Sequence, residues 1–156
     1  MHNTPKSNLK TGLLLHDDDL ELSTIVNSLQ IDSTIAINNA NELSPWECAK
    51  PVYQFVQSLV EDASKRYKDK IGPVKIVKKP EEIIAWSEEN NLDQIVTAYA
   101  ATGPNAAMIT NLNKLGLNII QISKKYDQRA WPHATHGFFR FKEKIPALVK
   151  ELGLTS

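Results

Sequence analysis

The sequence has 156 residues, enough to bury a sizeable hydrophobic core in one domain without disulfides or metal ions. Lysine plus arginine and aspartate plus glutamate each number 18, so the net charge is zero. This balance argues against a domain that binds nucleic acid directly through its bulk charge, and it leaves a local charged patch open. The single cysteine, Cys48, excludes an internal disulfide, and we expect a reducing, cytoplasmic setting.

No apolar run approaches the length of a membrane span, so we expect no membrane partner. The first ten residues also lack the apolar segment of a signal peptide. We predict that residues 1–10 are a disordered lead-in, or the place where a longer chain was cut. Residues 11–156 are predicted to form a single α/β domain.

The first half of the chain predicts two strands, each followed by a helix. Thr11–Leu15 and Ser33–Ile37 are short apolar runs typical of buried strands. Leu20–Leu29 has helical spacing, and Pro51 is well placed to begin a long amphipathic helix. The core face of that long helix is predicted to carry Phe55, Val56, Leu59, Val60, Ala63 and Tyr67.

The second half continues the alternation. Val74–Val77, Gln94–Tyr99 and Leu117–Ile122 are predicted strands, and Pro80 begins a helix between the first two of them. Ala106–Leu115 is the next helix, with Ala107, Ile109, Leu112 and Leu115 on or near its inner face. The rest predicts a loop over Tyr126–Thr135 and a final helix over Lys144–Leu152, with Ile145, Leu148, Val149 and Leu152 inward.

Five strands that alternate with helices predict the α/β class, with a doubly wound, five-stranded parallel sheet of the Rossmann-like type. The expected strand order is 3-2-1-4-5, which places the switch point between the first and fourth strands. The segments that follow these two strands should meet at one edge of the sheet. The candidate ligand cleft is therefore lined by His16, Asp17, Thr102, Gly103 and Asn105.

The turn Thr102–Asn105 admits two interpretations. Gly103 permits a close backbone approach, Pro104 favours a helix start, and the free amides of the next turn suit an anion or a nucleotide. An ordinary helix start fits equally well. The turn is neither a P-loop, because no Gly-Lys-Ser/Thr follows, nor a dinucleotide fingerprint, because the three spaced glycines are absent.

The acidic run Asp17–Asp19 suits a divalent cation, although such clusters more often cap a helix. Together with Thr97 and a lysine after the fifth strand, the run also invites comparison with phosphoacceptor domains. Those domains need an acceptor aspartate after the third strand, and here Lys78 and Lys79 stand there. We therefore reject that reaction and assign no catalytic or metal-binding residue.

The segment Trp131–Lys144 combines aromatic and basic residues. Its aromatic side chains, Trp131, Phe138, Phe139 and Phe141, would pack the tail of the chain onto the sheet. Alternatively, they form a docking surface for another domain or a stacking surface for a planar ligand.

The order of these segments resembles the α/β antenna domain of DNA photolyases and cryptochromes. The resemblance rests on the helix Tyr53–Asp62, the strand Val74–Val77, the Pro-led helix at Pro80–Ile84, the strand Gln94–Tyr99, and the tail from Tyr126 to Pro146. Two features depart from that family. Only Asp17–Leu20 remains of the Arg-rich stretch after the first strand, and the large helical flavin-binding domain is absent.

The resemblance implies a domain that is non-catalytic alone and packs on a flavin-binding domain in cis or in trans. It would hold a folate or deazaflavin antenna chromophore, FAD would belong to the absent domain, and the full system would repair DNA or sense light.

One alternative is a universal-stress-type nucleotide-binding protein, for which a homo-oligomer is expected. Another is an interaction module with an empty cleft that docks through Trp131–Phe141.

Overall fold

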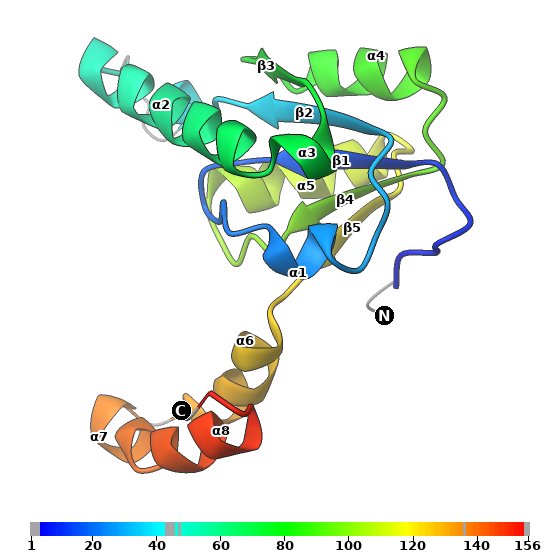
Figure 1. Ribbon diagram of the computed structural model, residues 1–156. Coiled ribbons are helices and arrows are strands. Elements are labelled where there is room, and N and C mark those ends of the chain that lie inside the picture. Colours follow the sequence, from blue (N-terminus) through cyan, green and yellow to red (C-terminus); the bar gives the residue numbers. More distant parts are fainter. Residues whose placement is uncertain (1–3, 43–45, 47, 136, 155–156) are drawn as a thin grey trace. The chain divides into compact units, whose positions relative to one another are not determined.

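The computed structural model describes residues 4–42, 46, 48–135 and 137–154. The chain divides into two compact units, residues 1–122 and residues 123–156. The first unit holds the whole sheet (Figure 1). This division does not test the prediction that residues 11–156 form one domain, which therefore stays a prediction.

The sheet of the first unit has five strands, all parallel, in the order β3-β2-β1-β4-β5. The α/β class, the doubly wound parallel sheet and the predicted strand order are confirmed. The strands are β1 (Thr11–Leu15), β2 (Ser33–Ile37), β3 (Val74–Val77), β4 (Gln94–Ala98) and β5 (Ile119–Ile122).

Helices cover both faces of the sheet. Successive side chains of a strand point to opposite faces, and here the side chains on both faces are apolar and need cover from water. Leu14 of β1 belongs to the core under two helices, whereas Leu13 and Leu15 belong to the core on the opposite face. The first face is covered by α4 (Glu81–Glu89) and α5 (Pro104–Lys114). The second is covered by α1 (Ser23–Val26), α2 (Lys50–Arg66) and α3 (Lys68–Ile71) (Figure 1). A short 3-10 helix, η1 (Ala40–Glu42), follows β2.

Helix α4 lies close to the sheet because β1 carries a glycine beneath it. A Cβ atom on Gly12 would lie 2.5 Å from both Trp86 and Leu92, well inside van der Waals contact. Trp86 is only 3% exposed, and its indole Nε1 donates a hydrogen bond of 2.9 Å to Ser33 Oγ. The absence of a side chain at Gly12 therefore makes room for the largest side chain of the core.

Two predicted helices differ from the observed ones. Helix α1 has only four residues of the predicted Leu20–Leu29, because Asp19 and the hydroxyl of Tyr67 bind the backbone amides of Glu21 and Leu22 just before it. In α5, Met108 and Ile109 face the core, whereas the predicted inner residues Ala107 and Leu115 are exposed.

Helix α2 confirms part of its predicted core face. Val56, Val60 and Ala63 are buried, at the spacing of one helical face. Phe55 was also predicted to point inward, but it is 63% exposed. Because a helix has 3.6 residues per turn, Phe55 lies to one side of the helix face that carries the three buried residues.

Part of the predicted disordered lead-in is attached to the sheet. The backbone N–H of Lys6 donates to Gln94 Oε1 over 3.0 Å, and Gln94 Nε2 donates to the Lys6 carbonyl over 2.7 Å. The amide of Lys10 donates to Asp93 Oδ2 over 2.9 Å. Residues 6–10 are thus held by β4 and its preceding turn, and residues 1–3 lie outside the described residues.

The second unit is helical: α6 (Lys125–Ala130), η2 (Trp131–His133), α7 (Gly137–Lys142) and α8 (Ile145–Glu151). The predicted loop over Tyr126–Thr135 is wrong, because α6 and η2 occupy most of it. Ala130 and Leu148 are buried, and Arg129 pairs with Glu151 between α6 and α8. Packing of the aromatic tail on the sheet would be a contact between the two units and stays a prediction.

Over the part of the chain that the structure describes, no helix combines the length and the apolar character needed to cross a membrane.

Candidate functional site

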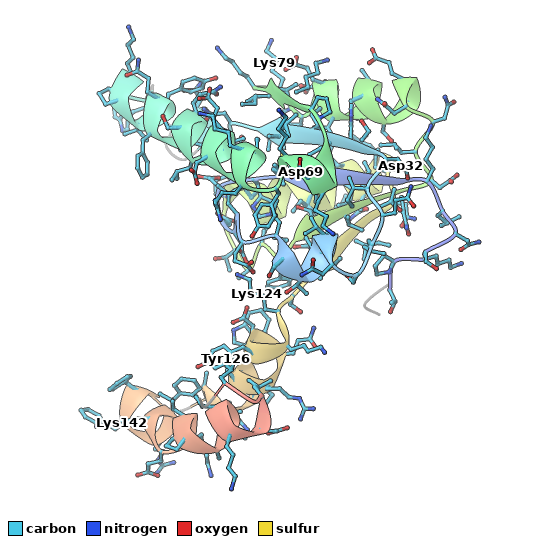
Figure 2. The ribbon with its side chains drawn as sticks, viewed as in Figure 1. Asp32, Asp69, Lys79, Lys124, Tyr126 and Lys142 are labelled. Carbon is cyan, nitrogen blue, oxygen red and sulfur yellow. The ribbon has the colours of Figure 1, made fainter. Side chains whose placement is uncertain are left out.

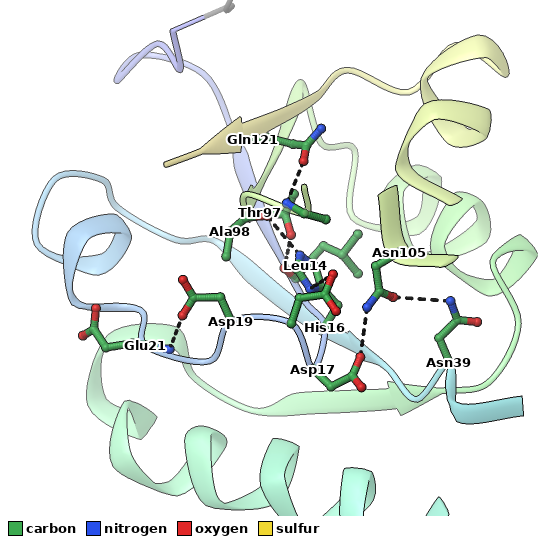
Figure 3. A network of polar contacts seen from close by, with 12 residues as sticks. Leu14, His16, Asp17, Asp19, Glu21, Asn39, Thr97, Ala98, Asn105 and Gln121 are labelled. Atoms are coloured by element: carbon green, nitrogen blue, oxygen red, sulfur yellow. Dashed lines mark hydrogen bonds and ion pairs between the residues drawn. The ribbon is translucent and has the colours of Figure 1, made fainter. Parts of the chain in front are cut away.

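The two strand ends at the switch point are joined by a hydrogen bond. Asp17 follows β1 and Asn105 lies in the first turn of α5, after β4. Asn105 Nδ2 donates to Asp17 Oδ1 over 2.9 Å, as Figure 3 shows. Two of the predicted cleft residues are therefore brought together, but they bind each other across the crevice.

A third residue, Asn39, extends this contact. Asn39 follows β2, and its Nδ2 donates to Asn105 Oδ1 over 3.3 Å (Figure 3). A carboxylate can only accept, so Asn105 turns its amide nitrogen toward Asp17 and its oxygen toward Asn39. Asn39 must then offer its own nitrogen to Asn105. Asp17 thus fixes the orientation of both amides.

This orientation leaves Asn39 Oδ1 without a partner. The residue is 4% exposed, and among the described residues no group donates a hydrogen bond to that oxygen. A buried acceptor without a donor costs about 1–3 kcal/mol of stability. A molecule that supplies an N–H or O–H to Asn39 would remove that cost.

Asn39 lies on the wall of a pocket between the first turns of α4 and α5. The pocket has a volume of about 480 Å³, within the range of small-molecule sites. Its wall is formed by Asn39, the start of α4 (Pro80 and Glu81) and, from α5 and its cap, Gly103, Pro104, Ala107, Met108 and Asn111. The pocket thus lies beside the switch point, on the face that α4 and α5 cover.

The first turn of α5, which adjoins the pocket wall at Gly103 and Pro104, suits an anion. The helix begins after Gly103, and no side chain caps it. Pro104 has no N–H, so the amides of Asn105 and Ala106 are the donors of this turn that lack a partner within the helix. Space at Gly103 is open, since no atom lies within 4 Å of the position of a Cβ. A phosphate or carboxylate can therefore approach this turn closely.

The α4 side of the pocket has the opposite preference. Glu82 already accepts hydrogen bonds from the amides of Lys78 and Lys79, at 3.2 and 3.1 Å. Glu81 adds a carboxylate to the pocket wall. An anion would be repelled here, whereas N–H and O–H groups would be bound. The acidic side of the pocket and the adjoining first turn of α5 therefore favour different groups of a ligand.

The other two predicted cleft residues have different surroundings. His16 is 1% exposed, and its Nε2 lies 3.0 Å from the carbonyl oxygen of Ala98, which fits a role inside the fold. Its Nδ1 lies 4.0 Å from Asp18 Oδ2. Thr102 is exposed in the loop before α5, next to Gly103. Of the five predicted residues, Gly103 alone is on the pocket wall.

The acidic run after β1 serves local structure. Asp19 Oδ1 accepts a hydrogen bond of 3.0 Å from the amide of Glu21. Within the described ranges, no group of three or more His, Cys, Asp or Glu side chains is arranged to hold a metal ion. Thr97 is buried and donates to the carbonyl of Leu14 over 2.9 Å, as a core residue does.

Sequence reasoning did not find Asn39, Glu81 or Asn111. The signal available for Asn39 was its place directly after a buried strand, at the same edge of the sheet as Asp17. Glu81 and Asn111 are exposed residues of helices, and they reach the pocket because two helices separated by a strand lie side by side. No spacing in the sequence shows that proximity.

Comparisons with known protein families, with curated proteins and with solved structures give no match to this chain.

Proposed function

We propose that this chain is a ligand-binding α/β domain that holds a small organic anion in the pocket between α4 and α5. The observation that carries the proposal is Asn39, which lies on the pocket wall and whose buried Oδ1 has no hydrogen-bond donor among the described residues. Buried polar side chains of native proteins nearly always have a hydrogen-bond partner, and a donor group of a bound ligand would supply one to Asn39. The wall offers hydrogen bonds and one carboxylate, which suit binding.

The pocket and the adjoining turn of α5 define the class of ligand. The amides of Asn105 and Ala106, in the turn that adjoins the pocket wall at Gly103 and Pro104, favour a phosphate or carboxylate, and Asn39 with Glu81 favours N–H or O–H groups. Folates, deazaflavin cofactors and nucleotides all combine an anionic group with a ring or sugar that donates hydrogen bonds. The pocket volume of about 480 Å³ suits binding of a large part of such a molecule.

Among these ligands we propose an antenna chromophore, a folate or a deazaflavin. The support is the resemblance of the segment order to the α/β domain of photolyases and cryptochromes. In that case the domain collects light and catalyses nothing alone, and it packs on a flavin-binding domain in cis or in trans that would hold FAD. Light-dependent DNA repair or light sensing would be the activity of the whole system.

A nucleotide is the second candidate, and the first turn of α5 favours it. This turn has an uncapped pair of amides and an open approach at Gly103, as phosphate binding requires. A universal-stress-type protein would use ATP or AMP here. The two proposals name different ligands for one pocket, so a single series of titrations distinguishes between them.

The test is a titration of the full chain with a folate, a deazaflavin, ATP and AMP. Absorbance and fluorescence follow the chromophores, and calorimetry follows the nucleotides. We expect micromolar binding of one ligand class, and Asn39→Leu should weaken it by at least about tenfold because it removes a buried hydrogen bond. Asn118→Leu, a change at an exposed amide away from the pocket, should leave the affinity unchanged.

Thermal melting of both variants shows whether they fold. If no ligand binds at millimolar concentration, the proposal of a ligand-binding pocket is wrong. If a ligand binds equally well to folded Asn39→Leu, the pocket between α4 and α5 is not its site.

A further inference from the structure

The zero net charge of the chain conceals two units of opposite charge. Residues 123–156 contain seven lysines and arginines but three aspartates and glutamates, a net charge of +4. Residues 1–122 contain 11 and 15, a net charge of −4. A polyanion would therefore be attracted to the second unit and repelled by the first.

The second unit also exposes aromatic rings among its positive charges. Phe138 and Phe139 of α7 are 67% and 83% exposed, and α7 has no buried residue. The same helix carries Arg140 and Lys142, and Lys142 is labelled on it in Figure 2. These side chains do not contribute to the core of the second unit, so packing within that unit does not explain them.

The two phenylalanine rings keep open faces. Their centroids are 5.8 Å apart and their planes meet at 69°, an edge-to-face arrangement. In this geometry the rings do not cover each other face to face. A planar group can therefore stack on either ring while a nearby cation binds an anionic group.

We propose that α7 and its flanking residues bind single-stranded nucleic acid. Unpaired bases stack on Phe138 and Phe139, and the phosphates lie against Arg140, Lys142 and Lys144. Stacking rings interleaved with cations are the combination that single strands require, because every base has a π face and every nucleotide a charge. The expectation of no nucleic-acid binding rested on the net charge of the whole chain, which averages the two units.

Two other polyanions fit less well. Helices that lie on anionic membranes separate a long apolar face from a charged face. Helix α7 has six residues, and Arg140 stands directly between Phe139 and Phe141. An acidic protein would bind the cations but would leave the exposed rings without a specific role. Both partners are included as competitors in the test.

The test measures the fluorescence anisotropy of a labelled 15-nucleotide single strand with the full chain, over a series of salt concentrations. We expect Phe138→Ala and Phe139→Ala each to weaken binding at least about fivefold, by loss of stacking. Arg140→Gln with Lys142→Gln should lower the slope of log affinity against log salt by about 1.4, since each phosphate contact contributes about 0.7.

Matched controls lie on the first unit. Phe55→Ala removes a phenylalanine that is 63% exposed, and Lys68→Gln with Lys70→Gln removes two exposed lysines. These variants should bind as the unchanged chain does. Circular dichroism and thermal melting verify that each variant is folded.

The proposal is overturned if the strand does not bind at 50 mM salt, or if folded α7 variants and controls lose affinity equally. It is also overturned if anionic phospholipid vesicles or poly-glutamate compete as well as unlabelled single strand does at equal charge. In that case the surface binds a membrane or an acidic protein.

Discussion

Asn105 donates a hydrogen bond of 2.9 Å to Asp17, and this contact joins the carboxyl end of β1 to the first turn of α5. The bond spans the switch point of the sheet, where a doubly wound fold ordinarily opens its crevice. Because Asn105 is 1% exposed, its two amide contacts are part of the core. The pocket lies next to this bridge, between α4 and α5.

The bridge should contribute measurably to stability. We expect Asn105→Ala to lower the free energy of unfolding by about 2–4 kcal/mol, because a buried hydrogen bond to Asn39 and a partly buried one to Asp17 are lost, and both partners are left without Asn105. Urea unfolding measures the difference. Asn111→Ala, at an exposed position of the same helix, should change stability by less than about 0.5 kcal/mol. Equal losses in the two variants would contradict the role given to the bridge.

Gly103 should matter for both folding and ligand binding. Its φ of 93° and ψ of −167° lie in a region that glycine alone adopts readily, so Gly103→Ala should cost about 1–3 kcal/mol. The added methyl group would also stand at the approach to the amides of α5. We expect weaker binding of whichever ligand the titration identifies, together with a lower midpoint of thermal unfolding.

Gly116 provides the control for that change. It has a φ of 101°, and no atom lies within 4 Å of the position of its Cβ, but it is not on the pocket wall. Gly116→Ala should therefore lose stability and keep the ligand affinity unchanged. If Gly116→Ala weakens binding as much as Gly103→Ala does, the effect comes from stability and not from the pocket.

Gly12 and Trp86 should be energetically coupled. Gly12→Ala forces its methyl group to within 2.5 Å of Trp86 and Leu92, and we expect a loss of about 1–3 kcal/mol. Trp86→Leu is destabilising alone, because it removes core volume and the bond to Ser33. It also removes one of the two side chains that clash with the added methyl group, so the double variant should lose less than the sum of the single losses. Additive losses in urea unfolding would show that the contact is not tight.

The architecture of the first unit could be predicted from the amino-acid sequence. Periodic apolar runs, prolines at helix starts and acidic first turns are local signals, and they located β1, β2 and β3 exactly. The strand order was predicted from the doubly wound class that the alternation of strands and helices indicates, and it is confirmed. Such signals work because burial of a strand on both faces, or of one helix face, is recorded in consecutive residues. The charge imbalance between residues 1–122 and 123–156 is also present in the sequence, but it becomes meaningful only once the two units are known.

The contacts between polar side chains could not be predicted in this way, because they depend on the tertiary structure. Asn39 and Asn105 are 66 residues apart, and their hydrogen bond depends on two strand ends that meet at one edge of the sheet. The sequence placed Asp17 and Asn105 at that edge, but it did not show that they bind each other and that a different amide is left with an unpaired oxygen. Hydrogen-bond direction follows from the positions of all three groups together, and no local pattern records it.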